Sequence, residues 1–142
     1  MLVSQILKAK GDAVFTVTPH ETLGAVCALL HSRRVGAMVV MDSEAVAGIV
    51  SERDVVRAMA ELGAGALSQA VSLWMTRDVL FAQPGESVDS LLGRMTDRRV
   101  RHLPVVQNDR LMGIISIGDL VKSKISEVEA EASGLKAYIA AG

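Results

Sequence analysis

Two short motifs carry the side chains best suited to hold a ligand. In residues 48–54 and again in residues 113–119, a glycine and two hydrophobic residues precede a serine, and an aspartate follows three positions later. The hydroxyl can donate to a phosphate oxygen, and one carboxylate can accept from both hydroxyls of a ribose. If each motif lies where a strand turns into a helix, the free N–H groups, the helix dipole and the adaptable glycine also favour a close phosphate. The motifs therefore suit a ligand that carries phosphate and ribose.

The same motifs also have a purely structural interpretation. A serine at a helix start, followed three residues later by an acid, resembles a capping box in which both side chains satisfy free N–H groups. Ser51 with Asp54 and Ser116 with Asp119 have this spacing. Taken alone, the motif favours the cap, so the sequence leaves the two interpretations open.

An internal repeat must position both motifs. Residues 14–57 align with residues 79–122 without a gap. In each copy a short apolar strand, at residues 14–17 and 79–82, precedes a segment whose apolar residues follow the i, i+3, i+4, i+7 spacing of an amphipathic helix. The helical positions are Leu23, Val26, Cys27 and Leu30 in the first copy, and Val88, Leu91, Leu92 and Met95 in the second.

Each copy continues with a hairpin and a second helix. Two short apolar runs separated by polar turn residues predict the hairpin. The runs are residues 37–41 with 46–50, and residues 102–106 with 111–115. The second helix is expected to begin at Asp54 and at Asp119. Each copy is therefore predicted to be β-α-β-β-α.

The last segment predicts one long helix with an apolar seam. The seam residues are spaced alternately by four and three positions, which is the heptad pattern of a coiled coil. They are Val121, Ile125, Val128, Ala132, Leu135 and Ile139. The seam could pack on its own domain or against a second subunit, and the sequence leaves both open.

Composition excludes several classes of protein. The 142 residues are 50% hydrophobic with a net charge of −1, which argues against disorder and against a basic nucleic-acid binder. One cysteine, Cys27, excludes an intramolecular disulfide framework. No apolar run approaches the length of about 18 residues that a membrane span needs, and the N-terminal charge order differs from that of a signal peptide. We therefore expect a cytoplasmic protein without membrane association.

The sequence also lacks the marks of an enzyme or a metal site. Three scattered histidines have no metal-ligand spacing, so no metal is expected. Phosphate-loop, dinucleotide-binding and nucleophile-elbow motifs are absent. Asp54 and Asp119 are one per copy, and nothing places them as an acid–base pair. We expect no independent catalytic activity.

The two ordered copies resemble a tandem pair of cystathionine-β-synthase (CBS) domains. The strongest matches are residues 98–106 and 113–119, with residues 35–40 and 48–54 in the first copy. The resemblance implies an α+β (α/β-like) fold of two pseudo-symmetric β-α-β-β-α units packed through their sheets, plus the long C-terminal helix. The expected boundaries are residues 1–62 for CBS unit 1, 63–70 for a linker, 71–124 for CBS unit 2 and 125–142 for the C-terminal helix extension.

The resemblance implies a regulatory or sensor module. It would bind adenosine-containing nucleotides of the AMP, ADP, ATP or NADH class in the cleft between the two units, with AMP as the first candidate. Signalling would act in trans on an effector protein through a conformational shift, and a homodimer is expected. The alternative is a ligand-free interaction dimer assembled through the C-terminal helix.

The resemblance also implies the site residues. Asp54 and Asp119 would hold ribose, and Ser51 and Ser116 would face phosphate or ribose. The other implied positions are Thr16, Val17, Gly36, Ala37, Met38, Arg53, Phe81, Ala82, Arg101, His102, Leu103, Pro104, Ile117 and Gly118. The first copy departs from the family pattern because Val39 stands where the second copy has Pro104. Its site is therefore expected to be less standard.

A local arginine cluster supports a phosphate ligand in the second copy. Residues 94–101 contain four arginines and only Asp97 as an acid. We predict phosphate contacts for Arg99 and Arg101, because the guanidinium fork suits phosphate oxygens. Arg94 and Arg98 could instead belong to a solvated helix face. His102 is equally compatible with packing and with ligand contact.

Overall fold

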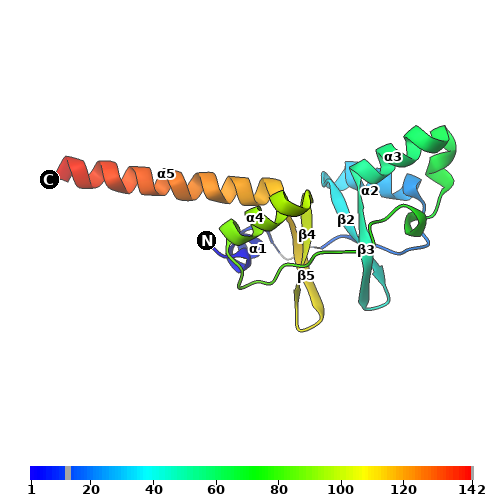
Figure 1. Cartoon of the computed structure of the whole chain (residues 1–142), viewed down its shortest axis with the longest axis horizontal. Coiled ribbons are helices and arrows are strands. Elements are labelled where there is room, and N and C mark those ends of the chain that lie inside the picture. Colours follow the sequence, from blue (N-terminus) through cyan, green and yellow to red (C-terminus); the bar gives the residue numbers. More distant parts are fainter. Residues whose placement is uncertain (12–13, 142) are drawn as a thin grey trace. The chain divides into compact units, whose positions relative to one another are not determined.

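The computed structural model describes residues 1–11 and 14–141, and mixes helices and strands (Figure 1). The helices are α1 (Val3–Lys10), α2 (Leu23–Arg33), α3 (Glu52–Leu62), α4 (Val88–Arg98) and α5 (Ile117–Ala141). The strands are β1 (Thr16–Val17), β2 (Ala37–Asp42), β3 (Ala45–Ser51), β4 (His102–Gln107) and β5 (Arg110–Ser116). Two short 3-10 helices, η1 (Gly63–Ser68) and η2 (Val71–Leu73), follow α3. The α+β class and the long C-terminal helix are confirmed. Within the described residues, no helix has the length and apolar character to cross a membrane.

The chain forms two compact units that do not follow its order. The first-copy unit runs from Val14 to Leu80 and includes Asn108–Leu111. The second-copy unit begins with α1 and continues through Phe81–Gln107 and from Met112 along α5. The sequence-based boundaries were continuous stretches, whereas the compact units are interleaved, with α1 assigned to the second copy.

The first-copy unit contains a three-stranded sheet in the order β1-β2-β3. β1 pairs with β2 in parallel, and β2 pairs with β3 as the predicted antiparallel hairpin. Helix α2 begins after Thr22, whose side chain accepts a hydrogen bond from the Ala25 N–H at 3.1 Å. Its buried face packs in a core with the sheet. This core contains Val17, Leu23, Val26, Leu30, Met38, Val40, Val50, Ala58, Ala66, Val71 and Met75.

The second-copy unit has a two-stranded β4-β5 sheet, and the predicted opening strand at residues 79–82 is wrong. Only Ala82 pairs there, through a parallel bridge to Val105. The Ala82 N–H donates to the Pro104 carbonyl and the Val106 N–H donates to the Ala82 carbonyl, each at 2.9 Å. A second hydrogen bond from β4 to the opening segment would need the backbone N–H of residue 104, and this residue is a proline, which has no N–H. The ladder therefore ends after one residue.

Matching backbone contacts attach one flanking segment to each unit. In the second-copy unit, the N–H groups of Val3 and Ser4 donate to the carbonyls of Glu86 and Pro84, each at 2.9 Å. The first-copy unit repeats this arrangement, from Val71 to Glu21 at 2.8 Å and from Ser72 to Pro19 at 3.1 Å. The segment before each copy in the sequence thus pairs with the other copy.

The second helix of each copy begins two residues earlier than predicted. We expected starts at Asp54 and Asp119, whereas α3 begins at Glu52 and α5 at Ile117. The physical reason is that the preceding serine ends the strand, so the aspartate already lies in the first helical turn. Both motifs therefore lie at a direct strand-to-helix junction.

Candidate functional site

The second-copy motif forms a capping box at the start of α5. The Ser116 N–H donates to Asp119 Oδ2 at 2.9 Å, and the Asp119 N–H donates to Ser116 Oγ at 3.1 Å. The structural interpretation of this motif is therefore realised. The cap uses only one of the two Asp119 carboxylate oxygens, Oδ2, so it leaves the other oxygen for a ligand.

Lys10, from α1, is a further partner of Asp119. Its Nζ donates to Asp119 Oδ2 at 2.7 Å and to the Ile114 carbonyl at 3.0 Å. The Asp119 side chain keeps 24% of its surface exposed. Among the described residues, its other oxygen, Oδ1, has no hydrogen-bond partner. The arrangement presents a half-buried carboxylate beside a lysine ammonium and a helix N-terminus, with one oxygen that accepts no hydrogen bond from a described residue.

Opposing effects act on the Asp119 carboxyl. Burial raises its pKa. The hydrogen bonds from Lys10 and from the Ser116 N–H, together with the Lys10 charge, lower the pKa by more than burial raises it. The resulting pKa of Asp119 lies below the ordinary value for aspartate. Asp119 is therefore ionised at neutral pH and able to accept hydrogen bonds.

The first-copy aspartate is enclosed more completely. Asp54 Oδ2 accepts from the Ser51 N–H at 2.9 Å and from Ser51 Oγ at 3.2 Å. Asp54 Oδ1 accepts from Arg57 Nη2 at 3.2 Å. Asp54 is only 8% exposed. Both of its carboxylate oxygens already have partners within the chain.

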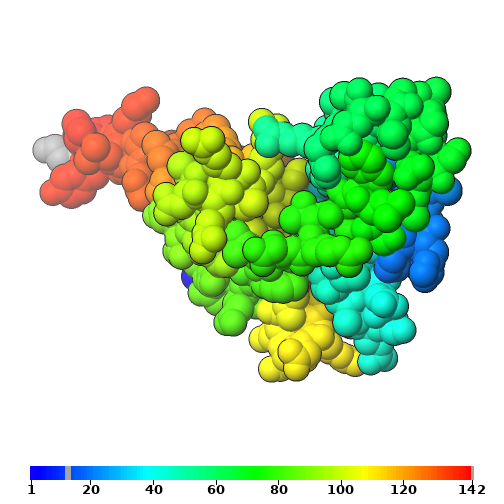
Figure 2. Space-filling model, turned by 45° about the vertical axis from the view of Figure 1, so that its right-hand side comes forward, coloured from blue at the N-terminus to red at the C-terminus, as the bar shows by residue number. Residues whose placement is uncertain are grey.

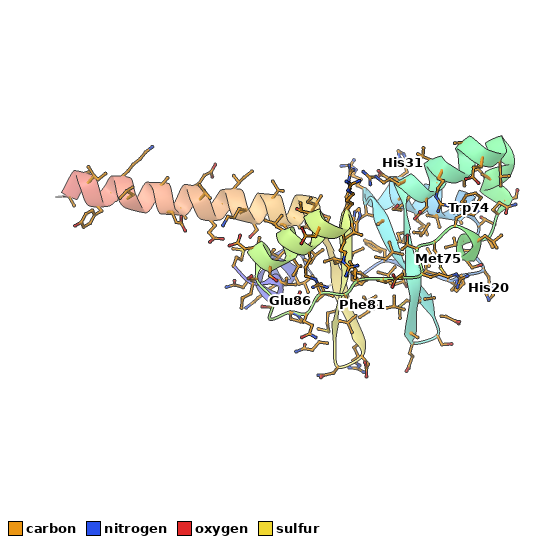
Figure 3. The ribbon with its side chains drawn as sticks, viewed as in Figure 1. His20, His31, Trp74, Met75, Phe81 and Glu86 are labelled. Carbon is orange, nitrogen blue, oxygen red and sulfur yellow. The ribbon has the colours of Figure 1, made fainter. Side chains whose placement is uncertain are left out.

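Arg57 is itself fixed against the tryptophan of the same unit. Its Nη2 also donates to the Trp74 carbonyl at 2.9 Å, and its guanidinium carbon lies 5.0 Å from the centre of the Trp74 ring. Figure 3 labels Trp74 and Met75 in the segment that follows η2. The Arg57 contacts make Asp54 part of a structural network. Neither Arg57 nor Lys10 is predicted as a partner of these aspartates by any motif in the sequence.

The motif glycines allow a close approach by the protein itself. A Cβ atom on Gly48 would lie 2.6 Å from the Thr76 carbonyl oxygen, and one on Gly113 would lie 2.7 Å from Leu7 Cδ2. From the sequence alone, these glycines are expected to allow close approach to a ligand. In the structure, each instead admits the flanking segment that packs on its unit.

Of the other predicted positions in the second copy, Ile117 and Gly118 follow Ser116 directly, and Arg101 is joined to this turn through its backbone. The Ile117 N–H donates to the Arg101 carbonyl at 2.8 Å, which joins the start of β4 to the start of α5. His102 is half-buried. Buried positions are Ala82, Leu103 and Pro104, whereas Phe81, Arg101, Ile117 and Gly118 are exposed.

The first copy has an equivalent junction. The Glu52 N–H donates to the Gly36 carbonyl at 3.0 Å. Gly36 and Ser51 are half-buried. Buried positions are Val17, Ala37 and Met38, whereas Thr16 and Arg53 are exposed. The buried members support the site through packing.

The arginine cluster divides into different roles. Arg94 lies half-buried and donates to both Glu86 oxygens, at 3.1 and 2.9 Å, and to the Phe81 carbonyl at 2.7 Å. Figure 3 labels Glu86 and Phe81 in the segment before α4. Arg94 is thus a structural contact rather than part of a solvated face. Arg99 ends α4 in the left-handed region (φ 54°) and, like Arg98 and Arg101, is exposed.

The described part of the chain contains no group of three or more His, Cys, Asp or Glu side chains that could hold a metal ion. The candidate chemistry rests on the Ser116 turn, the Asp119 carboxylate and the Lys10 ammonium.

Comparisons with known proteins match nearly the whole chain. The family model described as CBS domain matches residues 4–61 and 69–126. CBS domain-containing protein CBSX3, mitochondrial, from Arabidopsis thaliana is 32% identical over 149 residues, which cover 99% of this chain and 72% of that protein.

Solved structures agree. The CBS-domain containing protein ATU1752 from Agrobacterium tumefaciens is 45% identical with a TM-score of 0.85, covering 87% of this chain and 99% of that one. The CBS domain pair of protein MJ0100, in complex with 5′-methylthioadenosine and S-adenosyl-L-methionine, is 22% identical with a TM-score of 0.80, covering 89% and 98%. This last likeness concerns the fold alone. The chain belongs to the CBS domain family and carries two consecutive CBS domains.

Proposed function

We propose that this CBS pair is a non-catalytic regulatory module that binds an adenosine-containing nucleotide at the Ser116 turn of its second copy. AMP is the first candidate, with ADP, ATP and NADH as the others. The proposed setting is the cytoplasm, and the proposed output is a conformational shift that an effector protein detects in trans. A ligand can shift such an equilibrium only through its difference in affinity for the two states.

One observation carries the choice of the second copy. Asp119 offers an ionised oxygen, Oδ1, to which no described residue donates a hydrogen bond, whereas both oxygens of Asp54 accept hydrogen bonds within the chain. A ribose diol needs such an acceptor. The neighbouring Lys10 ammonium and the N-terminus of α5 add positive charge suited to a phosphate. The first copy lacks an equally available acceptor.

The ligands of a related fold widen the panel of candidates. S-adenosyl-L-methionine and 5′-methylthioadenosine, named with the MJ0100 pair, share an adenosine moiety but carry no phosphate. The panel must therefore separate recognition of ribose from recognition of phosphate. Recognition of the ribose alone would accept all of these compounds, and recognition of phosphate would favour AMP, ADP, ATP and NADH over the two compounds that lack phosphate.

Isothermal titration of the full chain tests the proposal. We expect AMP to bind, and Asp119→Ala to weaken binding by about tenfold or more, because it removes charged hydrogen bonds. Asp119→Asn keeps an acceptor for the Ser116 N–H and controls for loss of the cap. Asp54→Ala should change the affinity much less. No binding of any panel member at millimolar concentration would contradict the proposal.

A second function, a ligand-free interaction dimer, is favoured by the exposed apolar seam of α5. It predicts that truncation after Lys124 abolishes dimerisation and function, while Asp119→Ala leaves function intact. The nucleotide proposal predicts the opposite sensitivity to Asp119→Ala.

A further inference from the structure

Helix α5 continues well beyond the part that packs on its own unit. Leu120 and Ser123 are buried, Lys124 Nζ lies 3.0 Å from Asp89 Oδ1, and Glu127 lies 3.7 Å from the N-terminal amino group. From residue 129 to residue 141, every side chain is exposed. Figures 1 and 2 show this orange-to-red half of α5 extending past α4. Isolated helices of this length are marginally stable in water, so packing against a partner would stabilise this half of α5.

The apolar seam runs along α5 from Val121 to Ile139 and so continues into the exposed half. The large seam residues are exposed by 44% at Val121, 53% at Ile125, 51% at Val128, 61% at Leu135 and 67% at Ile139. Ala132 is also exposed. The heptad spacing assigns Ile125, Ala132 and Ile139 to a positions, and Val121, Val128 and Leu135 to d positions. A seam of this period fits a second helix with the same repeat.

The charged residues beside the seam alternate in sign. The e positions are Lys122, Glu129 and Lys136, and the g positions are Lys124, Glu131 and Tyr138. In a parallel coiled coil, each g residue faces the e residue five positions further along the other chain. Lys124 then meets Glu129 of the partner subunit, and Glu131 meets Lys136 of the partner subunit. Each attraction occurs twice by symmetry.

An antiparallel pair has no such complementarity. If two antiparallel helices share the whole seam, Glu129 faces Glu129 of the partner subunit and Glu131 faces Glu131 of the partner subunit. These are like charges beside an apolar interface, which disfavours the arrangement. The Lys124 ammonium has three donors, so it can keep Asp89 while it contacts a partner carboxylate.

We propose that α5 pairs with α5 of a second copy of this chain as a parallel, in-register, two-stranded coiled coil. Isoleucine at two of the three a positions and leucine at d position 135 agree with two strands, whereas the other two d positions are valine. This inference concerns assembly and does not depend on nucleotide binding.

Disulfide trapping in the full chain tests the orientation. In a Cys27→Ser background, Val128→Cys should form a covalent dimer on mild oxidation, because identical d positions face each other in a parallel pair. Ala130→Cys, on the outer face of the same turn, is the matched control and should not cross-link. Trapping that is equal at both positions, or trapping only between Val128→Cys and Ala132→Cys chains, would overturn the proposal.

Charge exchange gives a second test, read by sedimentation. Glu131→Lys should raise the dimer dissociation constant by about tenfold, because both copies of one attraction become repulsive. Glu131→Lys combined with Lys136→Glu should restore it. Failure of the combined variant to recover, or a monomeric parent protein at all concentrations, would contradict the parallel pairing.

Discussion

Asp54 and Asp119 occupy equivalent places in the two copies, and each meets a cation from a different source. Arg57 comes from the same helix as Asp54, whereas Lys10 comes from α1, far away in the sequence. Arg57 binds the second carboxylate oxygen of Asp54, whereas Lys10 binds the oxygen of Asp119 that already serves the cap. The same motif therefore produces one closed carboxylate and one with an available oxygen.

Lys10→Met tests the electrostatic part of this difference. The folded-state pKa of Asp119 is lowered, so its contribution to stability is present above the ordinary aspartate pKa of about 3.9 and is lost as the pH falls through the lowered value. We expect Lys10→Met to lower the free energy of unfolding by at most about 1 kcal/mol at neutral pH. The difference from the parent should vanish in strong acid.

Denaturant unfolding followed by circular dichroism at several pH values measures this difference. Lys8→Met is the matched control, since Lys8 is exposed on the same helix and has no hydrogen bond or ion pair to a described residue. If the difference in unfolding free energy between Lys10→Met and the parent persisted in strong acid, it could not come from the Lys10–Asp119 ion pair.

Arg57→Met tests the closure of the first copy. It leaves Asp54 Oδ1 without a partner in a buried position, so we expect a loss of about 1–3 kcal/mol in the free energy of unfolding. The emission of Trp74, the one tryptophan, should also change because the guanidinium no longer lies over its ring. Arg53→Met, an exposed neighbour on α3, should have little effect. Equal losses for the two variants would exclude the proposed role of Arg57.

At the scale of elements, the flanking segments complete each copy. α1 packs on the second-copy unit, and the segment around η2 packs on the first-copy unit through equivalent backbone contacts. The motif glycines on β3 and β5 make room for these segments. The glycines and the flanking segments are therefore parts of one packing arrangement.

Substitution of the glycines should have unequal effects. A Cβ at Gly48 meets a backbone carbonyl oxygen at 2.6 Å, which can shift only if the chain around Thr76 moves. A Cβ at Gly113 meets the end of the flexible Leu7 side chain. We expect Gly48→Ala to cost about 1–3 kcal/mol of stability and Gly113→Ala clearly less. Chemical unfolding of both variants measures this, and the reverse order would refute the packing explanation.

Removal of residues 1–10 should weaken the copy that is distant in sequence. Because α1 packs on the second-copy unit, amide hydrogen exchange should accelerate in α4 and β5 while β2 and β3 remain protected. Faster exchange in β2 and β3 instead would contradict this assignment.

The elements show which features local sequence could predict. Periodicity identified both hairpins and both amphipathic helices, because apolar spacing directly reflects which face is buried. The prediction of an opening strand in the second copy was wrong because Pro104, in the neighbouring strand β4, has no backbone N–H to donate to it. Lys10 left no local signal, since its partners Ile114 and Asp119 are distant in the sequence. The spacing of Ser51 with Asp54 and of Ser116 with Asp119 predicted the capping hydrogen bonds that the structure shows, whereas ligand binding by these residues stays a prediction. The unequal availability of the two aspartates depends on tertiary contacts that the local sequence does not show.

At the scale of the whole molecule, two sequence-related units carry motif aspartates that differ in availability, and α5 extends from the second unit. The repeat predicts two related sites, with a less standard one in the first copy, and the contacts of Asp54 and Asp119 favour occupation of the second copy alone. A regulatory molecule of this kind would respond to nucleotide through one site per chain and assemble through a separate helix.

The stoichiometry of nucleotide binding tests this account most directly. Titration of the full chain with AMP should give one bound nucleotide per chain, and Asp119→Ala should weaken this site while Asp54→Ala preserves it. Two equivalent nucleotides per chain, or binding that persists unchanged in Asp119→Ala and is lost in Asp54→Ala, would contradict it.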